Sequence, residues 1–159
     1  RNRLNLKSLR TTLLRDLIRI ISSGTEKISG KKIGVVDERS ELAGLYKGIS
    51  QNNIGPRTDV MDNCSKIDGM MLLIRSMSPE IIAVDEIGKS EDMKAIEEAI
   101  NAGISLLTTI HGDSFNSIES KPGMKKMLNQ NVFKRYVILS KKRGIGTVEK
   151  VLNHRLKEV

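Results

Sequence analysis

The chain has 159 residues, a hydrophobic content of 38% and a formal net charge of +8 at neutral pH. This length suits one domain with a sizeable core. The longest apolar runs are too short for a membrane span or a signal peptide, so we expect a cytoplasmic protein. The single cysteine, Cys64, excludes an internal disulfide and a zinc site built from several thiolates.

Positive charge gathers at the two ends of the chain. Residues 1–32 carry nine basic and two acidic residues, residues 33–120 carry seven and fifteen, and residues 121–159 carry eleven and two. Basic ends suit a nucleic acid, an anionic membrane surface or the acidic face of an adjacent subunit. Aromatic residues make up only 3% of the chain and leave few rings for base stacking, so we do not expect a nucleic-acid partner.

Helical and strand patterns alternate along the first half of the chain. A helical stripe that ends at residues 22–24 is formed by Leu6, Leu9, Leu13, Leu14, Leu17, Ile18 and Ile21. Residues 31–39 then predict a strand. Several glycines and Pro56 predict an irregular, ordered loop region over residues 40–62. A helix at about 64–77 follows, and it leads into a strand over residues 81–86.

The second half continues the same alternation. Ser90 is the predicted cap of a helix over residues 91–103, whose acidic first turn suits the helix dipole. A strand over 104–111 and a short helical region at about 114–130 come next. Residues 135–140 and 146–153 predict a hairpin around Gly144 and Gly146. Strands separated by helices of this length predict an α/β fold, with a mostly parallel sheet and helices on both faces.

Ionisable residues end three of the predicted strands. These endings are Asp37-Glu38-Arg39, Asp85-Glu86 and His111-Gly112-Asp113. Ligands of parallel sheets bind at the carboxyl ends of the strands, so we expect three carboxylate groups and an imidazole in one cleft. A buried strand that ends on paired acids favours a magnesium nucleotide site, because desolvated carboxylates need a cation or a proton as partner.

Four stretches of the chain carry a family resemblance: DERSELAGLYKG (37–48), GPRTD (55–59), MMLLIRSMSPEIIAVDEIG (70–88) and TTIHGDS (108–114). Together they resemble the stage III sporulation protein AA family, P-loop ATPase-like proteins of endospore-forming bacteria, and more distantly the secretion and pilus-motor ATPases. The resemblance spans nearly the whole chain. It implies that residues 1–159 form a single P-loop NTPase-type domain with a RecA- or AAA-like core, lacking an amino-terminal region present in the family.

The resemblance implies roles for five acidic residues. Asp37, Glu38 and Glu41 look like an acidic box, in which both glutamates are candidate catalytic residues and Asp37 a cofactor contact. Asp85 and Glu86 look like a Walker B pair, with Asp85 holding hydrated magnesium and Glu86 polarising the attacking water. Without the resemblance, Asp85 and Glu86 could be solvated acids, and the first group could be a strand-end salt-bridge cluster.

Four further residues match motifs of the family. His111 looks like its histidine box and is a candidate sensor of the γ-phosphate, with a hydrogen-bonded structural histidine as the alternative. Arg39, Arg57 and Arg75 are candidates for phosphate or intersubunit contacts. We therefore class Arg39 and Arg57 as candidate cofactor-binding residues and Arg75 as a candidate catalytic one.

The chain departs from the family at the phosphate loop. In the motif G-x-x-x-x-G-K-[ST], Leu4 and Leu9 stand for the two glycines and Arg10 for the lysine, while Thr11 and Thr12 remain. Leucine resists the backbone angles that glycine allows and crowds the anion, whereas arginine preserves only the charge. We expect Arg10, Thr11 and Thr12 to contact the cofactor as what remains of the ATP site, with Thr11 also a magnesium ligand. For the two threonines, ordinary first-turn helix residues are the alternative.

Two explanations of this altered loop stay open: a natural pseudo-ATPase that lost the loop, or a chain whose start departs from the intact protein. Our leading hypothesis is an ATP-binding or ATPase domain with ATP and Mg²⁺ as cofactors. The alternative is a non-hydrolysing assembly or scaffold module, and a basic nucleic-acid-binding domain is a weaker third. The sequence leaves open whether the chain hydrolyses ATP.

The resemblance also implies partners and a location. It implies a homo-oligomer, as a hexameric ring, that acts as the motor of a channel between mother cell and forespore. The expected partners are the membrane-embedded sporulation channel proteins. The expected location is the cytoplasm on the mother-cell side, with membrane association through those partners.

Overall fold

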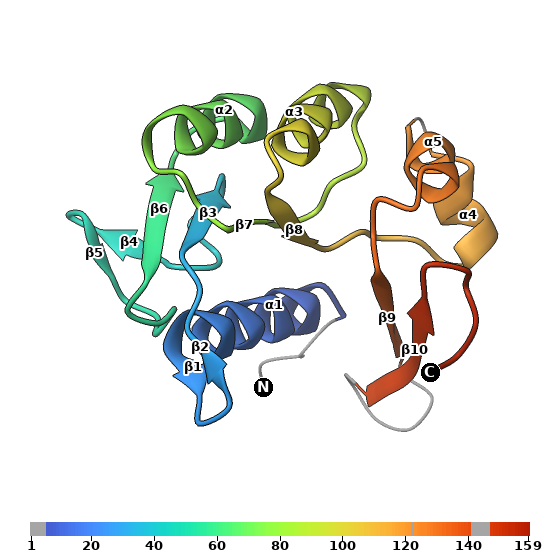
Figure 1. The fold of residues 1–159 in the computed structure, drawn as a ribbon, viewed down its shortest axis with the longest axis horizontal. Helices are drawn as coiled ribbons and strands as arrows, with labels where there is room; N and C mark the ends of the chain where they lie inside the picture. Colours follow the sequence, from blue (N-terminus) through green and yellow to red (C-terminus); the bar gives the residue numbers. More distant parts are fainter. Residues whose placement is uncertain (1–5, 122, 141–146) are drawn as a thin grey trace.

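The computed structural model describes residues 6–121, 123–140 and 147–159, which form an α/β fold around a four-stranded sheet (Figure 1). The strands in spatial order are β6 (Thr58–Asp62), β3 (Ile33–Asp37), β7 (Ile81–Val84) and β8 (Ser105–Thr108). All three pairings are parallel. The carboxyl ends of the strands therefore share one edge, here called the carboxyl edge, and their beginnings share the opposite amino edge.

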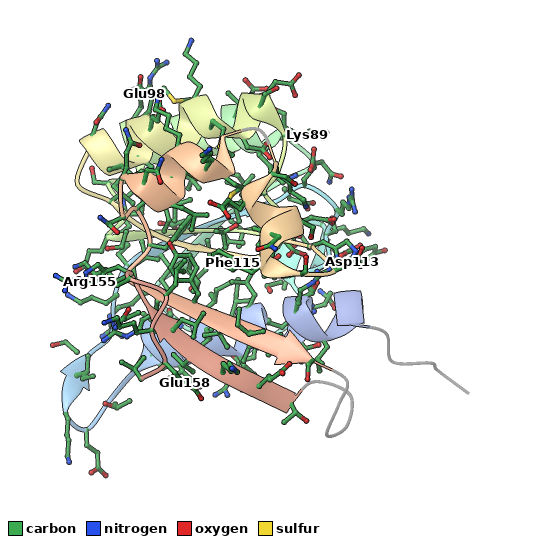
Figure 2. The ribbon with its side chains drawn as sticks, turned by 90° about the vertical axis from the view of Figure 1, so that its right-hand side faces the viewer. Lys89, Glu98, Asp113, Phe115, Arg155 and Glu158 are labelled. Carbon is green, nitrogen blue, oxygen red and sulfur yellow. The ribbon has the colours of Figure 1, made fainter. Side chains whose placement is uncertain are left out.

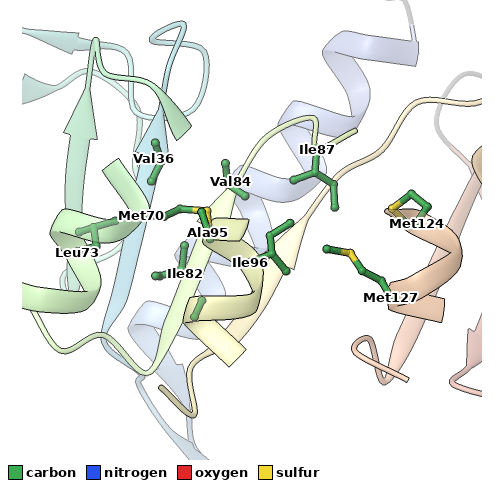
Figure 3. Close-up of a cluster of buried hydrophobic side chains, with 11 residues drawn as sticks. Val36, Met70, Leu73, Ile82, Val84, Ile87, Ala95, Ile96, Met124 and Met127 are labelled. Atoms are coloured by element: carbon green, nitrogen blue, oxygen red, sulfur yellow. The ribbon is translucent and has the colours of Figure 1, made fainter. Parts of the chain in front are cut away.

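Three helices cover the sheet: α1 (Leu6–Ser23), α2 (Lys66–Ser76) and α3 (Ser90–Asn101). Successive residues of a strand point to opposite faces. Ile33 and Val35 of β3 accordingly pack in a cluster with α1, whereas Val36 packs with α2 and α3 in the cluster that Figure 3 shows. The predicted α/β class and the helices on both faces are confirmed. The P-loop NTPase core remains a prediction.

Close approach of α2 to the sheet depends on a small residue at the contact. A Cβ atom on Gly69 would lie 2.6 Å from a methyl carbon of Val36 and 2.8 Å from the sulfur of Cys64. Such distances leave no room for a side chain, so glycine lets α2 sit directly against β3. Met70 and Leu73, on the neighbouring turns, are then fully buried against the sheet.

The prediction of an irregular loop over residues 40–62 was wrong in two places. Residues Leu45–Tyr46 (β4) and Ile49–Ser50 (β5) form a short antiparallel hairpin, with Lys47 and Gly48 at positive φ in its turn. Residues Thr58–Asp62 form β6, the edge strand paired in parallel with β3. All five residues of β6 are half-buried, so the segment lacks the apolar run by which a buried strand is recognised.

The start of α3 also differs from the prediction. The helix begins at Ser90 itself, so Ser90 is not its cap. The carboxylate of Asp92 instead accepts hydrogen bonds from the backbone N–H groups of Gly88 and Lys89, both at 3.0 Å. A buried carboxylate inside the first turn thus satisfies donors that would otherwise lack partners.

The remaining elements lie around this core. The helical region predicted at 114–130 consists of two short helices, α4 (Phe115–Glu119) and α5 (Met124–Asn129). The predicted hairpin is confirmed as β9 (Arg135–Ser140) paired antiparallel with β10 (Thr147–Asn153), while its expected turn around Gly144 and Gly146 lies outside the described residues. A small hairpin that was not predicted, β1 (Gly24–Thr25) and β2 (Ile28–Ser29), follows α1.

Among the described helices, none is both long and apolar enough to span a bilayer.

Candidate functional site

A hollow opens at the carboxyl edge where β3 and β7 end side by side. The carboxyl-edge hollow, as we call it, is lined chiefly by Asp37, Glu38, Arg39, Lys66, Asp85 and Glu86. Two of the three expected strand endings therefore meet in one place. In the view of Figure 2, Lys89, which follows β7, and Asp113, which follows β8, both lie toward the right-hand side.

Asp37 holds the loop that borders the hollow. Its side chain is buried, and its two oxygens accept backbone N–H groups of Glu41 at 2.9 Å, Leu42 at 3.1 Å and Ala43 at 2.8 Å. These backbone N–H donors compensate the free-energy cost of removing the Asp37 carboxylate from water. In the described contacts, Asp37 shapes the loop and so positions Glu41, which also lines the hollow. Its predicted cofactor contact stays a prediction.

Glu38 is paired with a lysine that sequence reasoning missed. The Nζ atom of Lys66 lies 2.7 Å from a carboxylate oxygen of Glu38, and the lysine side chain is only 10% exposed. The hydrogen bond from Lys66 lowers the pKa of the Glu38 carboxyl, and burial opposes this only in part. A lysine in the first turn of a helix is unfavourable, because its positive charge lies at the positive end of the helix dipole. This position could have indicated from the sequence that Lys66 has an anionic partner.

Arg39 and Glu86 face one another across the opening of the hollow. Their nearest charged atoms are 3.6 Å apart, and the side chains are 58% and 40% exposed. Glu86 has a φ of 51°, in the left-handed region that a non-glycine residue rarely occupies. Its backbone N–H donates to the hydroxyl of Thr109 at 2.9 Å, which holds the residue in this conformation.

Asp85 joins three segments of the chain through its carboxylate. One oxygen accepts the hydroxyl of Thr11 in α1 at 3.0 Å, and the other accepts the hydroxyl of Thr109, just after β8. Thr11 is buried, only 5% exposed. The structure thus brings the predicted pair of Thr11 and Asp85 together. Thr109 was missed, although its place in TTIH, next to His111, put it near the end of the third strand.

Arg10 lies beside His111 at the end of the third strand. Its guanidinium donates to the backbone carbonyl of Ile110 at 3.3 Å and to Nδ1 of His111 at 2.8 Å. Since a guanidinium is only a donor, the imidazole accepts through Nδ1. The backbone carbonyl of His111 accepts a further bond from Lys121. His111 is thus hydrogen-bonded, but its ring is outside the set of residues that line the hollow.

Three predicted site residues lie away from the hollow. Arg57 is at the amino edge, where its carbonyl pairs with Ile33 and its guanidinium donates to the carbonyl of Ser22 at 3.1 Å. Arg75 is exposed in the last turn of α2, the end of the helix that leads back to the start of β7. Thr12, next to the buried Thr11, is exposed on α1. Their predicted roles stay predictions.

The carboxylate of Asp85 and the hydroxyl of Thr11 are oxygen groups of the kind that a hydrated magnesium ion takes. The described residues contain no group of three or more histidine, cysteine or acidic side chains that could hold a metal. Mg²⁺ normally takes one or two carboxylates and completes its shell with water and substrate phosphates. The carboxylate of Asp85 and the hydroxyl of Thr11 are suitable partners for such an ion.

The described residues that match the phosphate loop lie in a helix. Helix α1 begins at Leu6, so Leu9 and Arg10, at the second glycine and the lysine positions of the motif, already lie within a helix. Their backbone cannot curl around an anion in the way a glycine-rich loop does. Leu4, at the first glycine position, lies outside the described residues.

Comparison with known proteins gives the family of the chain. The sequence model of the family described as "Sporulation stage III, protein AA" matches residues 7–159. The chain belongs to this family. The stage III sporulation protein AA of Bacillus subtilis (strain 168) is 46% identical over 142 residues, which are 89% of this chain and 46% of that protein. This chain therefore spans less than half the length of that relative, and the family resemblance expected from the four stretches is confirmed.

More distant relatives share the same part of the chain. An uncharacterized protein ycf45 of Porphyra purpurea is 26% identical over 121 residues, or 75% of this chain and 20% of its own length. The protein SEEDLING PLASTID DEVELOPMENT 1 of Arabidopsis thaliana is 26% identical over 123 residues, or 75% of this chain and 17% of its own length. The matched segment is thus a small part of each of these two longer proteins.

Proposed function

We propose that this chain is the ATP-binding domain of a stage III sporulation protein and that its carboxyl-edge hollow binds and hydrolyses magnesium-bound ATP. The observation that carries the proposal is the hydrogen bond of 3.0 Å between Thr11 and Asp85. It links a hydroxyl of the first helix to the first acid after a buried strand, and these are the two oxygen groups from which a magnesium nucleotide site is built.

In this proposal the residues of the hollow, together with Thr11 beside Asp85, each have a role in the chemistry. Magnesium, when bound, neutralises phosphate charge. Asp85 and Thr11 hold the water shell of the ion, and Glu86, next to Asp85 and partly exposed, accepts a proton from the attacking water. Arg39, 3.6 Å from Glu86, supplies positive charge near the reacting group. Glu41 borders the hollow as a second acidic contact.

The remaining predicted contacts extend the proposal to neighbouring subunits. Arg57 and Arg75 are exposed on the side away from the hollow, so they suit contacts with the nucleotide of an adjacent copy in a ring. His111 and Arg10 form a coupled pair at the end of β8, which suits a sensor of the bound phosphate. We propose that such a ring serves a sporulation channel from the mother-cell side.

A second candidate function is a non-hydrolysing assembly module. The helical conformation of Leu9 and Arg10 favours it, because the phosphate loop on which this class of ATPase depends is not formed by the described residues. In that case the fold and the exposed surfaces serve subunit contacts, and the acids at the carboxyl edge serve stability.

Phosphate release from ATP separates the two candidates. The chain should release phosphate in the presence of Mg²⁺, and Glu86→Gln should lower the rate about 100-fold while leaving binding intact, because an amide retains the shape but accepts no proton. Glu98→Gln, an exposed glutamate of α3, is the matched control and should leave the rate unchanged. ATP binding without turnover in the unmodified chain would support the assembly module instead.

A further inference from the structure

Thr109 connects the end of β8 to the turn that follows β7. The parallel register pairs Val84 with Thr108, so the next residues of the two segments, Asp85 and Thr109, are neighbours at the carboxyl edge. The hydroxyl of Thr109 donates to the carboxylate of Asp85 and accepts the backbone N–H of Glu86 at 2.9 Å. One hydroxyl therefore contacts both acids to which the proposed function gives a role.

The backbone of Thr109 adds a further contact to the same turn. Its carbonyl accepts the N–H of Ile87 at 2.9 Å, and Ile87 is buried. Glu86 lies between Asp85 and Ile87 and has a φ of 51°. A residue with a side chain stays in this conformation only where its surroundings hold it. Thr109 thus holds the chain before, at and after Glu86.

The hydrogen bonds around Asp85 orient both oxygens of its carboxylate. A threonine hydroxyl has a single proton, so the Thr109 hydroxyl that accepts from Glu86 directs this proton to Asp85. The second carboxylate oxygen accepts the hydroxyl of Thr11 at 3.0 Å. A carboxylate oxygen accepts more than one hydrogen bond, so both oxygens can also accept from water bound to magnesium.

The segment that carries Thr109 is itself held by α1. Arg10 donates to the carbonyl of Ile110 at 3.3 Å and to Nδ1 of His111 at 2.8 Å. Arg10 is also the neighbour of Thr11, so the helix that contacts the first acid fixes the segment that contacts both acids. A supporting residue with a fixed position of its own is what a precisely placed reacting group requires.

We propose that Thr109 is a positioning residue for ATP hydrolysis at the carboxyl edge. It fixes the carboxylate of Asp85, which holds the water shell of magnesium, and the backbone of Glu86. In the reaction, the water oxygen bonds to the γ-phosphorus, the bond to the ADP oxygen breaks, and the proton of the water goes to Glu86. The inference rests on the proposed function, because it assumes these roles for the two acids. Thr109 acts through the acids alone.

Phosphate release at saturating Mg²⁺ tests the inference. Thr109→Val removes the hydroxyl and preserves the branched shape, so kcat should fall about tenfold or more while KM for ATP changes less than about threefold. Thr109→Ser retains the hydroxyl and should stay within about threefold of the unmodified chain. Thr108→Val is the matched control, because the hydroxyl of this half-buried neighbour makes only a long contact of 3.4 Å with the carbonyl of Thr109, and the rate should be unchanged.

A second background separates positioning from stability. Where Glu86→Gln is already present, Thr109→Val should lower the rate less than about threefold, because the group that it positions has lost its function. A role in stability alone would give the same loss in both backgrounds. Should Thr109→Val not fold, Thr109→Cys replaces it, since a thiol is a weak donor and acceptor.

The outcomes distinguish this inference from the proposed function. If Thr109→Ser or Thr108→Val is as slow as Thr109→Val, or if the full loss persists beside Glu86→Gln, Thr109 is not a positioning residue, although the ATPase stands. If the unmodified chain binds ATP with Mg²⁺ but does not hydrolyse it, the proposed hydrolysis fails. The positioning of Asp85 is then decided by the Mg²⁺ concentration at half-maximal binding, which should rise several-fold in Thr109→Val but not in Thr109→Ser. No such rise, or no ATP binding at all, would overturn the inference.

Discussion

The two edges of the parallel sheet carry similar residue types in very different surroundings. At the amino edge, Lys31 pairs with Glu80 at 2.6 Å and Lys32 with Asp59 at 3.8 Å, and all four side chains are 41–48% exposed. At the carboxyl edge, three groups are much more deeply buried: Asp37 is 3% exposed, Thr11 5% and the Lys66 side chain 10%. The ion pair of Arg39 and Glu86 at the same edge is as exposed as the pairs of the amino edge, at 58% and 40%.

The two edges therefore differ more in how deeply some of their charged and polar side chains are buried than in whether these side chains are paired. Exposed ion pairs contribute little to stability and are screened by salt. Buried polar groups depend on their partners, because an unpaired one bears the full cost of desolvation. The carboxyl edge therefore holds its buried side chains, Asp37, Thr11 and Lys66, in fixed positions, which a binding site requires, while the amino edge tolerates change.

The largest effect on stability is expected at Asp37. Asp37→Ala should lower the free energy of unfolding by about 3 kcal/mol or more, because it removes a charged acceptor and leaves buried amide donors of the loop unpaired. The matched change at the amino edge, Asp59→Ala, should cost less than about 1 kcal/mol. Urea unfolding of both variants measures the contrast, and equal losses would contradict it.

An intermediate effect is expected from the backbone of Glu86. Its φ of 51° suits glycine better than any residue with a side chain. Glu86→Gly should therefore be more stable than Glu86→Ala by about 1 kcal/mol, although both lack the carboxylate. Thermal unfolding of the two variants compares them directly. A glycine variant less stable than the alanine variant would mean that this residue is not strained.

The smallest effect concerns the acid side of the stability curve. The pKa values of Glu38 and Glu80 are both lowered, chiefly by hydrogen bonds from Lys66 and Lys31. A lowered carboxyl pKa in the folded state adds stability above the unfolded value near 4.5, and this is lost as the pH falls through the lower folded value.

Glutamine variants at the two positions should therefore flatten the fall in stability below about pH 4.5. The dependence of these effects on salt concentration distinguishes the two ion pairs. At high ionic strength the effect of Glu80→Gln should vanish while most of that of Glu38→Gln persists, because the partner of Glu38 is buried. Urea midpoints measured between pH 3 and 6 at low and high salt are the readout. Equal salt sensitivity at both positions would count against the contrast.

Much of the fold could be predicted from the sequence, because its signals are local. The apolar stripe that contains Leu14 and Ile18 predicted α1, and the apolar strands followed by Asp37 and Asp85 predicted that these two strand endings would meet. The third expected ending, at His111, lies outside the lining of the hollow. Strand β6 was missed, since a half-buried edge strand has no continuous apolar run.

The partners within the site could not be predicted in the same way. That Asp37 accepts backbone N–H groups depends on the course of the loop after it, which no pattern of residue types specifies. Lys66 and Thr109 reach the acids from segments distant in sequence, so only the packing of α2 and the end of β8 brings them there. The positions of the acidic residues at the strand ends could be predicted from the sequence, whereas their hydrogen-bond partners could be identified only from the structure.

Calorimetric titration with ATP, with and without Mg²⁺, tests most directly whether the carboxyl edge is a magnesium nucleotide site. The unmodified chain should bind ATP only with Mg²⁺, Asp85→Asn should weaken binding at least about tenfold, and Asp59→Asn at the amino edge should have no effect. Binding that is absent, independent of Mg²⁺ or insensitive to Asp85→Asn would contradict the account.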